Sequence, residues 1–156
     1  MSALPPYLPQ DRLRALARGE TLPNRTTGSA LFADISGFTP LTEKLTRELG
    51  ARRGAEELTH QINAVYDALI AEIEKHGGSV INFAGDAITC WFDAGDGTRA
   101  PAQAVACALA LQATMLTFPA LALKVAVTTG EARRFIVGDP TIQLLDTLAG
   151  ATIARL

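Results

Sequence analysis

The longest regular pattern in the chain is a stripe of apolar residues that recur three and four positions apart between residues 54 and 75. Acidic and amide side chains occupy the other face, so this segment is predicted to be a long helix that packs against a core. Shorter helices are predicted over residues 39–49 and 101–115. Thr39 would cap the first of these, and Pro40 suits the first helical position. The stripe consists of Leu58, Ile62, Val65, Tyr66, Leu69, Ile70 and Ile73.

Short apolar segments between these helices predict strands, and the second and third strands flank a hairpin tip at Gly85-Asp86. The order is then strand, two helices, strand, strand, helix, strand. That order is typical of an α+β fold of the split βαβ kind. Two further short strands are expected on either side of Gly138-Asp139-Pro140. The main strand segments are residues 30–35, 80–83, 87–92 and 121–127.

The first 28 residues differ in pattern from the rest of the chain. Leu13, Leu16 and Ala17 would form the apolar face of one short helix, and residues 23–28 are typical of a polar linker. We therefore expect a leader over residues 1–28, which either docks on the following domain or extends from it. Residues 29–156 are expected to form one domain, which we interpret as truncated at Leu156 because the chain stops within a predicted helix.

Charge and cysteine content exclude several classes of function. The net charge is −2, from 14 basic and 16 acidic residues, so no basic field favours nucleic acid or a lipid surface. Cys90 and Cys107 lie in apolar segments and are expected to be buried free thiols. No signal peptide is recognised, and a cytoplasmic location is expected. Residues 100–123 carry no charge, but their alanine content and Pro119 favour a buried helix and a strand over a membrane span.

Candidate chemistry centres on two aspartates. Asp34 ends an apolar strand and is followed by Gly37 and a predicted helix, whereas Asp86 stands at the hairpin tip. Taken singly, each aspartate is equally typical of a plain turn. Taken together, they would bring two carboxylates to neighbouring strand ends, an arrangement that a divalent cation stabilises. A helix beginning after Gly37 would add unpaired backbone N–H groups, which suit phosphate.

These motifs resemble the catalytic domain of class III nucleotidyl cyclases, the adenylyl and guanylyl cyclase family. Residues 32–39, Phe-Ala-Asp-Ile-Ser-Gly-Phe-Thr, are similar to the family's first metal motif, and residues 83–87, Phe-Ala-Gly-Asp-Ala, to its second. Residues 125–131 resemble a later strand and its glycine turn. Residues 135–140 and 145–150 resemble the soluble, bicarbonate-responsive adenylyl cyclase branch. The resemblance implies a ferredoxin-like domain, with a mostly antiparallel sheet and helices on one face.

The resemblance further implies conversion of ATP to 3′,5′-cyclic AMP and pyrophosphate with two Mg²⁺ or Mn²⁺ ions. Asp34 and Asp86 would then be catalytic metal ligands, with the carbonyl of Ile35 as an additional ligand. The backbone at Gly37, Phe38 and Thr39 would receive the phosphates, and Asn82 and Asp146 would contact the purine. Asn82 stands where many members of the family carry lysine, which leaves the choice between ATP and GTP open.

The transition-state residues of the family are incompletely matched. The family supplies an asparagine and an arginine four positions apart. Here Arg155 is matched, whereas the position four before it is Ala151. Because family sites form between two domains, the resemblance implies a second cyclase domain as partner, and a homodimer of this chain would be slow or inert. Arg133 and Arg134 are expected to be solvated charges on a hairpin.

Three functions therefore remain as hypotheses. The first is a cyclase domain that acts on ATP with a complementary domain. The second is a weakly active or inactive regulatory module of the same fold, which binds nucleotide, bicarbonate or a partner domain. The third is a palm-type nucleotidyl transferase, against which the absence of a basic track in the sequence argues.

Overall fold

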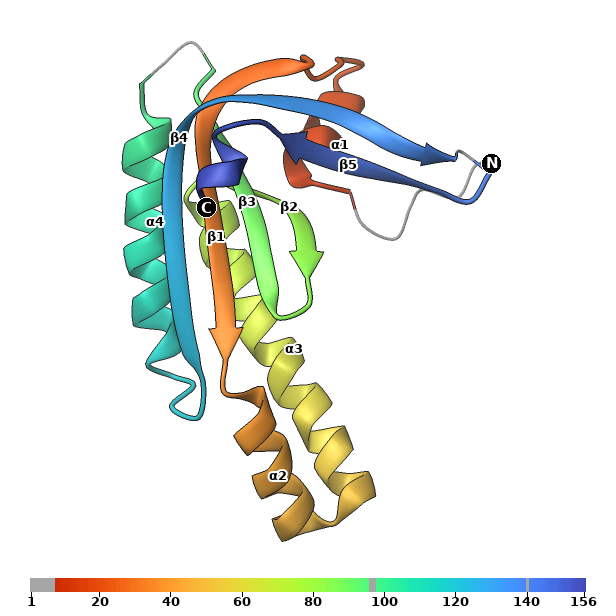
Figure 1. Ribbon diagram of the computed structural model, residues 1–156, viewed down its shortest axis with the longest axis vertical. Helices are drawn as coiled ribbons and strands as arrows, with labels where there is room; N and C mark the ends of the chain where they lie inside the picture. The colour runs from red at the N-terminus through yellow and green to blue at the C-terminus, as the bar shows by residue number, and fades with distance from the viewer. Residues whose placement is uncertain (1–7, 96–97, 140) are drawn as a thin grey trace.

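The computed structural model describes residues 8–95, 98–139 and 141–156, which form one sheet and its covering helices (Figure 1). The predicted helices over 39–49, 54–75 and 101–115 are all present, with ends displaced by three residues or fewer. The elements in chain order are α1 Gln10–Ala17, β1 Arg25–Ser36, α2 Phe38–Leu49, α3 Ala51–Lys75, β2 Ser79–Ala84, β3 Ala87–Asp93, α4 Ala100–Met115, β4 Ala122–Asp139, β5 Gln143–Ala149 and the 3₁₀ helix η1 Ile153–Arg155.

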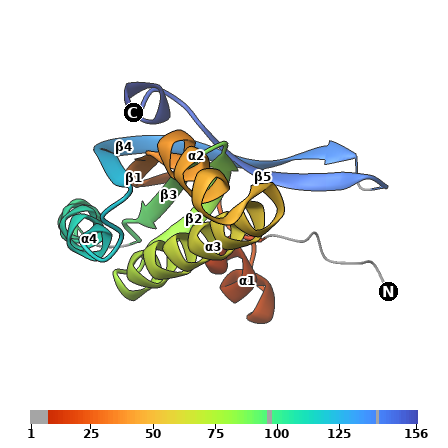
Figure 2. The same ribbon diagram turned by 90° about the horizontal axis from the view of Figure 1, so that it is seen from below.

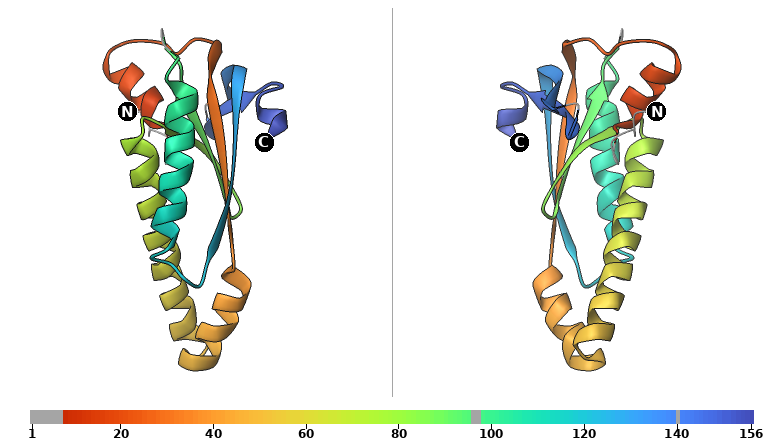
Figure 3. Two further views of the ribbon diagram at one scale, coloured as in Figure 1. Left: turned by 90° about the vertical axis from the view of Figure 1, so that its left-hand side faces the viewer. Right: turned by 90° about the vertical axis from the view of Figure 1, so that its right-hand side faces the viewer.

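The sheet has the strand order β2-β3-β1-β4-β5, and every neighbouring pair is antiparallel. Its first four strands follow the ferredoxin-like order, and the predicted α+β class is confirmed. Helices α3 and α4 cover one face of the sheet (Figure 3). The central position of β1 follows from its apolar sequence, because a strand paired on both sides and covered by helices needs apolar residues on the covered face.

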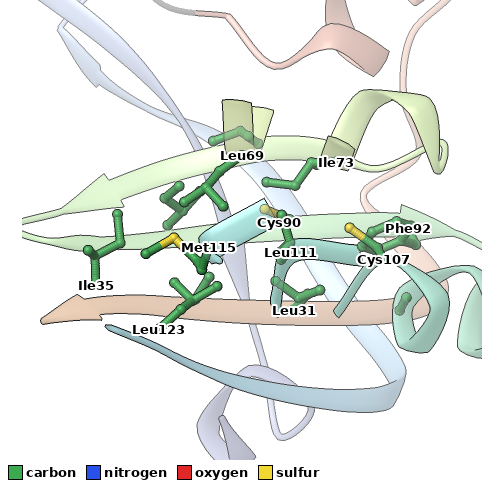
Figure 4. Packing of buried hydrophobic residues seen from close by; sticks show 14 of the residues in the cluster. Leu31, Ile35, Leu69, Ile73, Cys90, Phe92, Cys107, Leu111, Met115 and Leu123 are labelled. Atoms are coloured by element: carbon green, nitrogen blue, oxygen red, sulfur yellow. The ribbon is translucent and has the colours of Figure 1, made fainter. Parts of the chain in front are cut away.

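The main core lies between the sheet and the two covering helices (Figure 4). Leu31 and Ile35 of β1 point toward the helices and are buried with Leu69 of α3 and Leu111 of α4. Cys90 and Cys107 are buried free thiols, as expected. Burial raises the pKa of both thiols, that of Cys107 to about 12, so neither is reactive as a thiolate near neutral pH.

Helix α3 packs on the sheet only over its second half. Val65, Leu69 and Ile73 of the predicted stripe are buried, whereas Leu58 and Ile62 are half-buried. The first half of α3 pairs instead with α2, and the two helices project beyond the end of the sheet (Figure 1). Since α2 directly follows β1, this projection places the start of α2 at the end of the sheet where β1 stops.

A strand lies on either side of the expected turn near residues 138–140, but the first is the end of a longer strand and not a separate short one. The expected glycine turn near residue 130 was wrong. β4 is one strand of 18 residues that runs through Gly130. Its first part pairs with β1 as far as Arg133, and its last part, from Arg133, pairs with β5. A hydrogen-bonding partner is therefore present throughout, and the strand is not interrupted. The paired residues 133–139 and 143–149, here called the β4–β5 arm, extend away from the sheet (Figure 2).

The leader contributes to the domain more than its sequence indicated. β1 begins at Arg25, so part of the expected linker lies in the sheet. Helix α1 docks on the domain, but not through the predicted apolar face: Leu13, Leu16 and Ala17 are exposed, whereas Arg12 and Ala15 are buried. Ion pairs, described below, determine which face turns inward.

The uncharged segment 100–123 forms α4 and the start of β4, as predicted. Helix α4 is not buried all round, however, because Val105 and Leu109 are exposed on its outer face. Among the helices within the described ranges, none has both the length and the apolar character needed to cross a bilayer.

Candidate functional site

Asp34 and Asp86 come from neighbouring strands at one end of the sheet. Asp34 lies opposite Ala87 in the β1–β3 register. The amide of Ile35 donates a hydrogen bond to the carbonyl of Asp86 at 3.1 Å, so the backbones of the two aspartates lie one residue apart across the pair. Opposed residues of antiparallel strands have Cα atoms about 5 Å apart. The structure thus brings the two sequence motifs together.

The surroundings of the two carboxylates differ. Asp34 is half-buried, with Lys124 of β4 opposite it on the side away from β3, whereas Asp86 is exposed in the β2–β3 turn. Tyr66 of α3 contacts this turn, with its hydroxyl 3.5 Å from the carbonyl of Gly85 and its ring edge-on to Phe83 at 5.7 Å. Burial and the charge of Asp86 raise the pKa of Tyr66, which therefore stays a neutral donor.

Lys124 and Tyr66 were not recognised from the sequence as neighbours of the site. Tyr66 was predicted as part of the apolar stripe of the long helix, and Lys124 lies within the predicted strand 121–127. The periodicity located both elements correctly, but only the register between β1 and β4 places Lys124 opposite Asp34.

The donor set suits a divalent cation that arrives with its substrate. In the part of the chain that the structure describes, no group of three or more His, Cys, Asp or Glu side chains could hold a metal by itself. Mg²⁺ requires no such cage, because one or two carboxylates, waters and substrate phosphates complete its octahedral shell. Asp34 and Asp86, with the carbonyl of Ile35, therefore fit a cation shared with a polyphosphate.

The start of α2 adjoins Asp34 in the chain. Gly37 is the N-cap, and Phe38, Thr39 and Pro40 are the first helical residues. Thr39 was predicted to cap the helix and does not, because the helix begins earlier and the carbonyl of Gly37 already accepts from the amide of Leu41 at 3.2 Å. The first-turn N–H groups of Phe38 and Thr39 have no partner within the helix, which is the usual basis of anion binding at a helix start.

Replacement of Gly37 by alanine should destabilise the protein by about 2 kcal/mol. Gly37 has a φ of 106°, and a Cβ there would stand 2.8 Å from the carbonyl oxygen of Ala120. Gly50→Ala is the matched control, since Gly50 also has a positive φ, 81°, but open space around it. Urea denaturation of both variants separates the cost of a positive φ, which both share, from the cost of the contact with Ala120, which only Gly37→Ala has. An equal loss in both would show that the packing against Ala120 contributes nothing.

Asn82 and Asp146 line one pocket of about 400 Å³. They belong to β2 and β5, the first and last strands in the sheet order, yet both border the same space. Pro9, which precedes α1, forms part of the same wall. The two residues expected to contact a purine are thus brought together. The remaining lining residues are Ile81, Phe83, Thr89, Leu145, Thr147, Leu148 and Ile153.

The chain was compared with families, curated proteins and solved structures. No family model matches the chain. Over 61 residues, 39% of this chain, the sequence is 41% identical to adenylate cyclase type 10 of Rattus norvegicus and of Homo sapiens, and the match spans only 4% of those relatives. A bacterial light-regulated adenylyl cyclase superposes with a TM-score of 0.75 over 96% of this chain and 44% of that one, at 20% identity.

The adenylyl cyclase CyaB of P. aeruginosa gives a TM-score of 0.66 at 23% identity, over 84% of this chain and 69% of that one. A guanylate cyclase domain from Catenaria anguillulae, in complex with GTP, gives 0.67 at 18% identity, over 85% and 71%. The fold is that of a class III nucleotidyl cyclase domain. The resemblance inferred from the two aspartate motifs is confirmed, and because both adenylyl and guanylyl cyclases share the fold, it does not decide the nucleotide.

In this structure Asp146 does not face the pocket as a free carboxylate. Its Oδ2 accepts from Arg12 Nε at 2.5 Å and from Arg134 Nη2 at 2.9 Å, and its Oδ1 accepts from Arg134 Nε at 3.0 Å. Arg134 also binds the carboxylate of Asp11 through both terminal nitrogens. We call Asp11, Arg12, Arg134 and Asp146 the buried ion network.

The expectation that Arg134 is a solvated charge was wrong. Its side chain is 2% exposed, as is that of Asp146. Burial alone would lower the pKa of Arg134, but its hydrogen bonds to Asp11 and Asp146 raise it. Burial alone would raise the pKa of Asp146, but Arg12 and Arg134 lower it. The two positive charges of Arg12 and Arg134 therefore balance the two negative charges of Asp11 and Asp146 within the domain.

Arg155 lies away from the two aspartates of its own chain. It is exposed on η1, whose neighbours Ile153 and Leu156 pack near Ala30 of β1. Ala30 is four residues from Asp34, a separation of about 13 Å along a strand. In Figure 1 the C-terminus accordingly lies away from the end of β1 that leads into α2. A catalytic role for Arg155 beside Asp34 would require a second chain.

Proposed function

We propose that this chain is a nucleotidyl cyclase domain that converts ATP to 3′,5′-cyclic AMP and pyrophosphate together with a second cyclase domain. The observation that carries the proposal is the juxtaposition of Asp34 and Asp86 beside the open start of α2. The sequence identity with adenylate cyclase type 10 supports ATP as the substrate. A response to bicarbonate is proposed from the resemblance of residues 135–140 and 145–150 to the soluble adenylyl cyclase branch, and a cytoplasmic location is proposed with it.

In this proposal different residues bind the metal ions, the phosphates and the purine of the substrate. Asp34, Asp86 and the carbonyl of Ile35 would hold two Mg²⁺ or Mn²⁺ ions. The amides from Gly37 to Thr39 would bind the β- and γ-phosphates, and the amide of Asn82 would hydrogen-bond the purine edge. When bound, the cations would activate the ribose 3′-hydroxyl and neutralise the charge of the triphosphate.

The partner domain is supported by an apolar surface. Leu145 of the β4–β5 arm is 52% exposed and lies opposite Val137, which is 39% exposed. Phe135 lies on the same face, because side chains two residues apart on a strand point the same way. Exposed apolar patches of this kind mark interaction surfaces. A partner that carries both an asparagine and an arginine would complete the site. A second copy of this chain would offer Arg155 but Ala151, and loss of one such donor lowers a rate on the order of a hundredfold or more.

A regulatory module is the second candidate, and a specific observation favours it. Asp146, expected to recognise the purine, is held by Arg12 and Arg134 instead, and Asn82 adds no charge. Such a domain would bind nucleotide, bicarbonate or a partner domain without turnover.

The test is cyclic AMP formation after mixing this chain with a complementary cyclase domain in Mg²⁺ or Mn²⁺. We expect turnover of ATP in the mixture and little in either domain alone, with GTP assayed in parallel. Calorimetry distinguishes the alternative, since metal-dependent ATP binding without product supports the regulatory module. The absence of both binding and product would contradict the two proposals together.

A further inference from the structure

Helix α1 begins beside the candidate base pocket and is fixed there by polar contacts. Pro9, just before α1, lines the pocket. The amide of Asp11 donates to the hydroxyl of Ser79 at 3.0 Å, and its carboxylate binds Arg134. Arg12 reaches the carboxylate of Asp146. The docking of α1 and the state of Asp146 are therefore physically linked.

The carboxylate of Asp146 has little capacity left for a ligand while α1 is docked. A carboxylate offers about four lone-pair sites. Three are used: two on Oδ2, by Arg12 and Arg134, and one on Oδ1, by Arg134. The side chain is also only 2% exposed, so little of its surface is open to the pocket that Asp146 lines. Removal of Arg12 alone would free one site on Oδ2, while Arg134 would still hold the carboxylate in place.

We propose that α1 and the base of a bound nucleotide compete for the carboxylate of Asp146. This proposal rests on the proposed function, because it assumes that the pocket beside Asn82 receives a purine. The chemical group that competes with Arg12 is an exocyclic amino group, such as the 6-amino group of adenine. By linkage, a ligand that takes Asp146 weakens α1 docking by the same factor by which docked α1 weakens the ligand.

The construction of the domain allows α1 to leave without general unfolding. The main core cluster is built from the sheet, α3 and α4, and contains no residue of α1. Helix α1 has only eight residues, and its apolar Leu13 and Leu16 already face solvent. A short helix held mainly by polar contacts is a natural element for local release.

The experiment compares ATP with purine riboside triphosphate, which lacks the 6-amino group, by calorimetry in Mn²⁺. In Arg12→Gln the affinity for ATP should rise about tenfold, the size of one charged hydrogen bond, while that for the analogue stays unchanged. Arg14→Gln is the matched control, because Arg14 is exposed on the same helix, and it should change neither. In the unaltered chain, ATP should accelerate hydrogen exchange of the α1 amides more than the analogue does.

A second variant displaces α1 without replacing any of the four residues of the buried ion network. Ala15 is 2% exposed on the docked face of α1, so Ala15→Asp should displace the helix and raise ATP affinity in the same way. If both triphosphates bind but neither variant favours ATP, or if ATP leaves α1 exchange unchanged, the competition is refuted and the proposed function stands. If no variant binds either triphosphate, the proposed function fails, and this inference fails with it.

Discussion

Replacing Asp34 or Asp86 by asparagine should lower the rate of cyclic AMP formation by the mixed domains at least about a thousandfold, which corresponds to roughly 4 kcal/mol of transition-state stabilisation. Asparagine has nearly the same size but carries no negative charge. Because the two carboxylates lie on neighbouring strand ends, either loss would remove half of the charge available to cations at this position. The measurement is the initial rate at saturating ATP and metal.

Asp67→Asn serves as the control for this experiment. Asp67 lies exposed on α3, and its replacement should leave the rate unchanged. Circular dichroism should show that all three variants keep the same fold. Retention of more than about a tenth of the rate by a folded Asp34 or Asp86 variant, a loss of under about 1.4 kcal/mol, would contradict the metal-ligand assignment.

Arg134→Ala should lower the free energy of unfolding by about 3 kcal/mol, because it leaves the buried carboxylate of Asp146 with one partner and that of Asp11 without its guanidinium. For a domain of this size the midpoint of thermal unfolding should fall by roughly 10 °C. Urea denaturation followed by circular dichroism measures the free energy directly.

The neighbouring residue provides the control. Arg133→Ala removes an exposed arginine from the same strand, and such surface changes usually stay within about 0.5 kcal/mol. Equal losses in the two variants would mean that the buried ion network contributes no stability beyond that of an exposed charge.

Elements governed by local periodicity could be predicted from the sequence. The stripe of α3 and the hairpin at Gly85-Asp86 have spacings that a short window reveals, and α4 was expected from an alanine-rich segment without charge. The structure contains all three. The two aspartate motifs were recognised for the same reason, since each is a contiguous run of residues. Their meeting in space was expected because each stands at a strand end, and the register of β1 with β3 brings them together.

Features that depend on distant partners could not be predicted in this way. Arg134 was expected in solvent because its own neighbours indicate a hairpin, but its partner Asp11 stands 123 positions away. The inward face of α1 is determined by the same pairing, so its apolar residues misled the prediction. The length of β4 likewise depends on β1 and β5 together, which no local pattern contains.

The central claim is that Asp34 and Asp86 jointly hold divalent cations for a nucleotide. The most direct measurement is a crystal structure of the chain with Mn²⁺ and a non-hydrolysable ATP analogue, with data collected at the manganese absorption edge. We predict manganese peaks bonded to carboxylate oxygens of both residues, with the phosphates at the start of α2. A bound analogue whose manganese contacts neither carboxylate would contradict the claim.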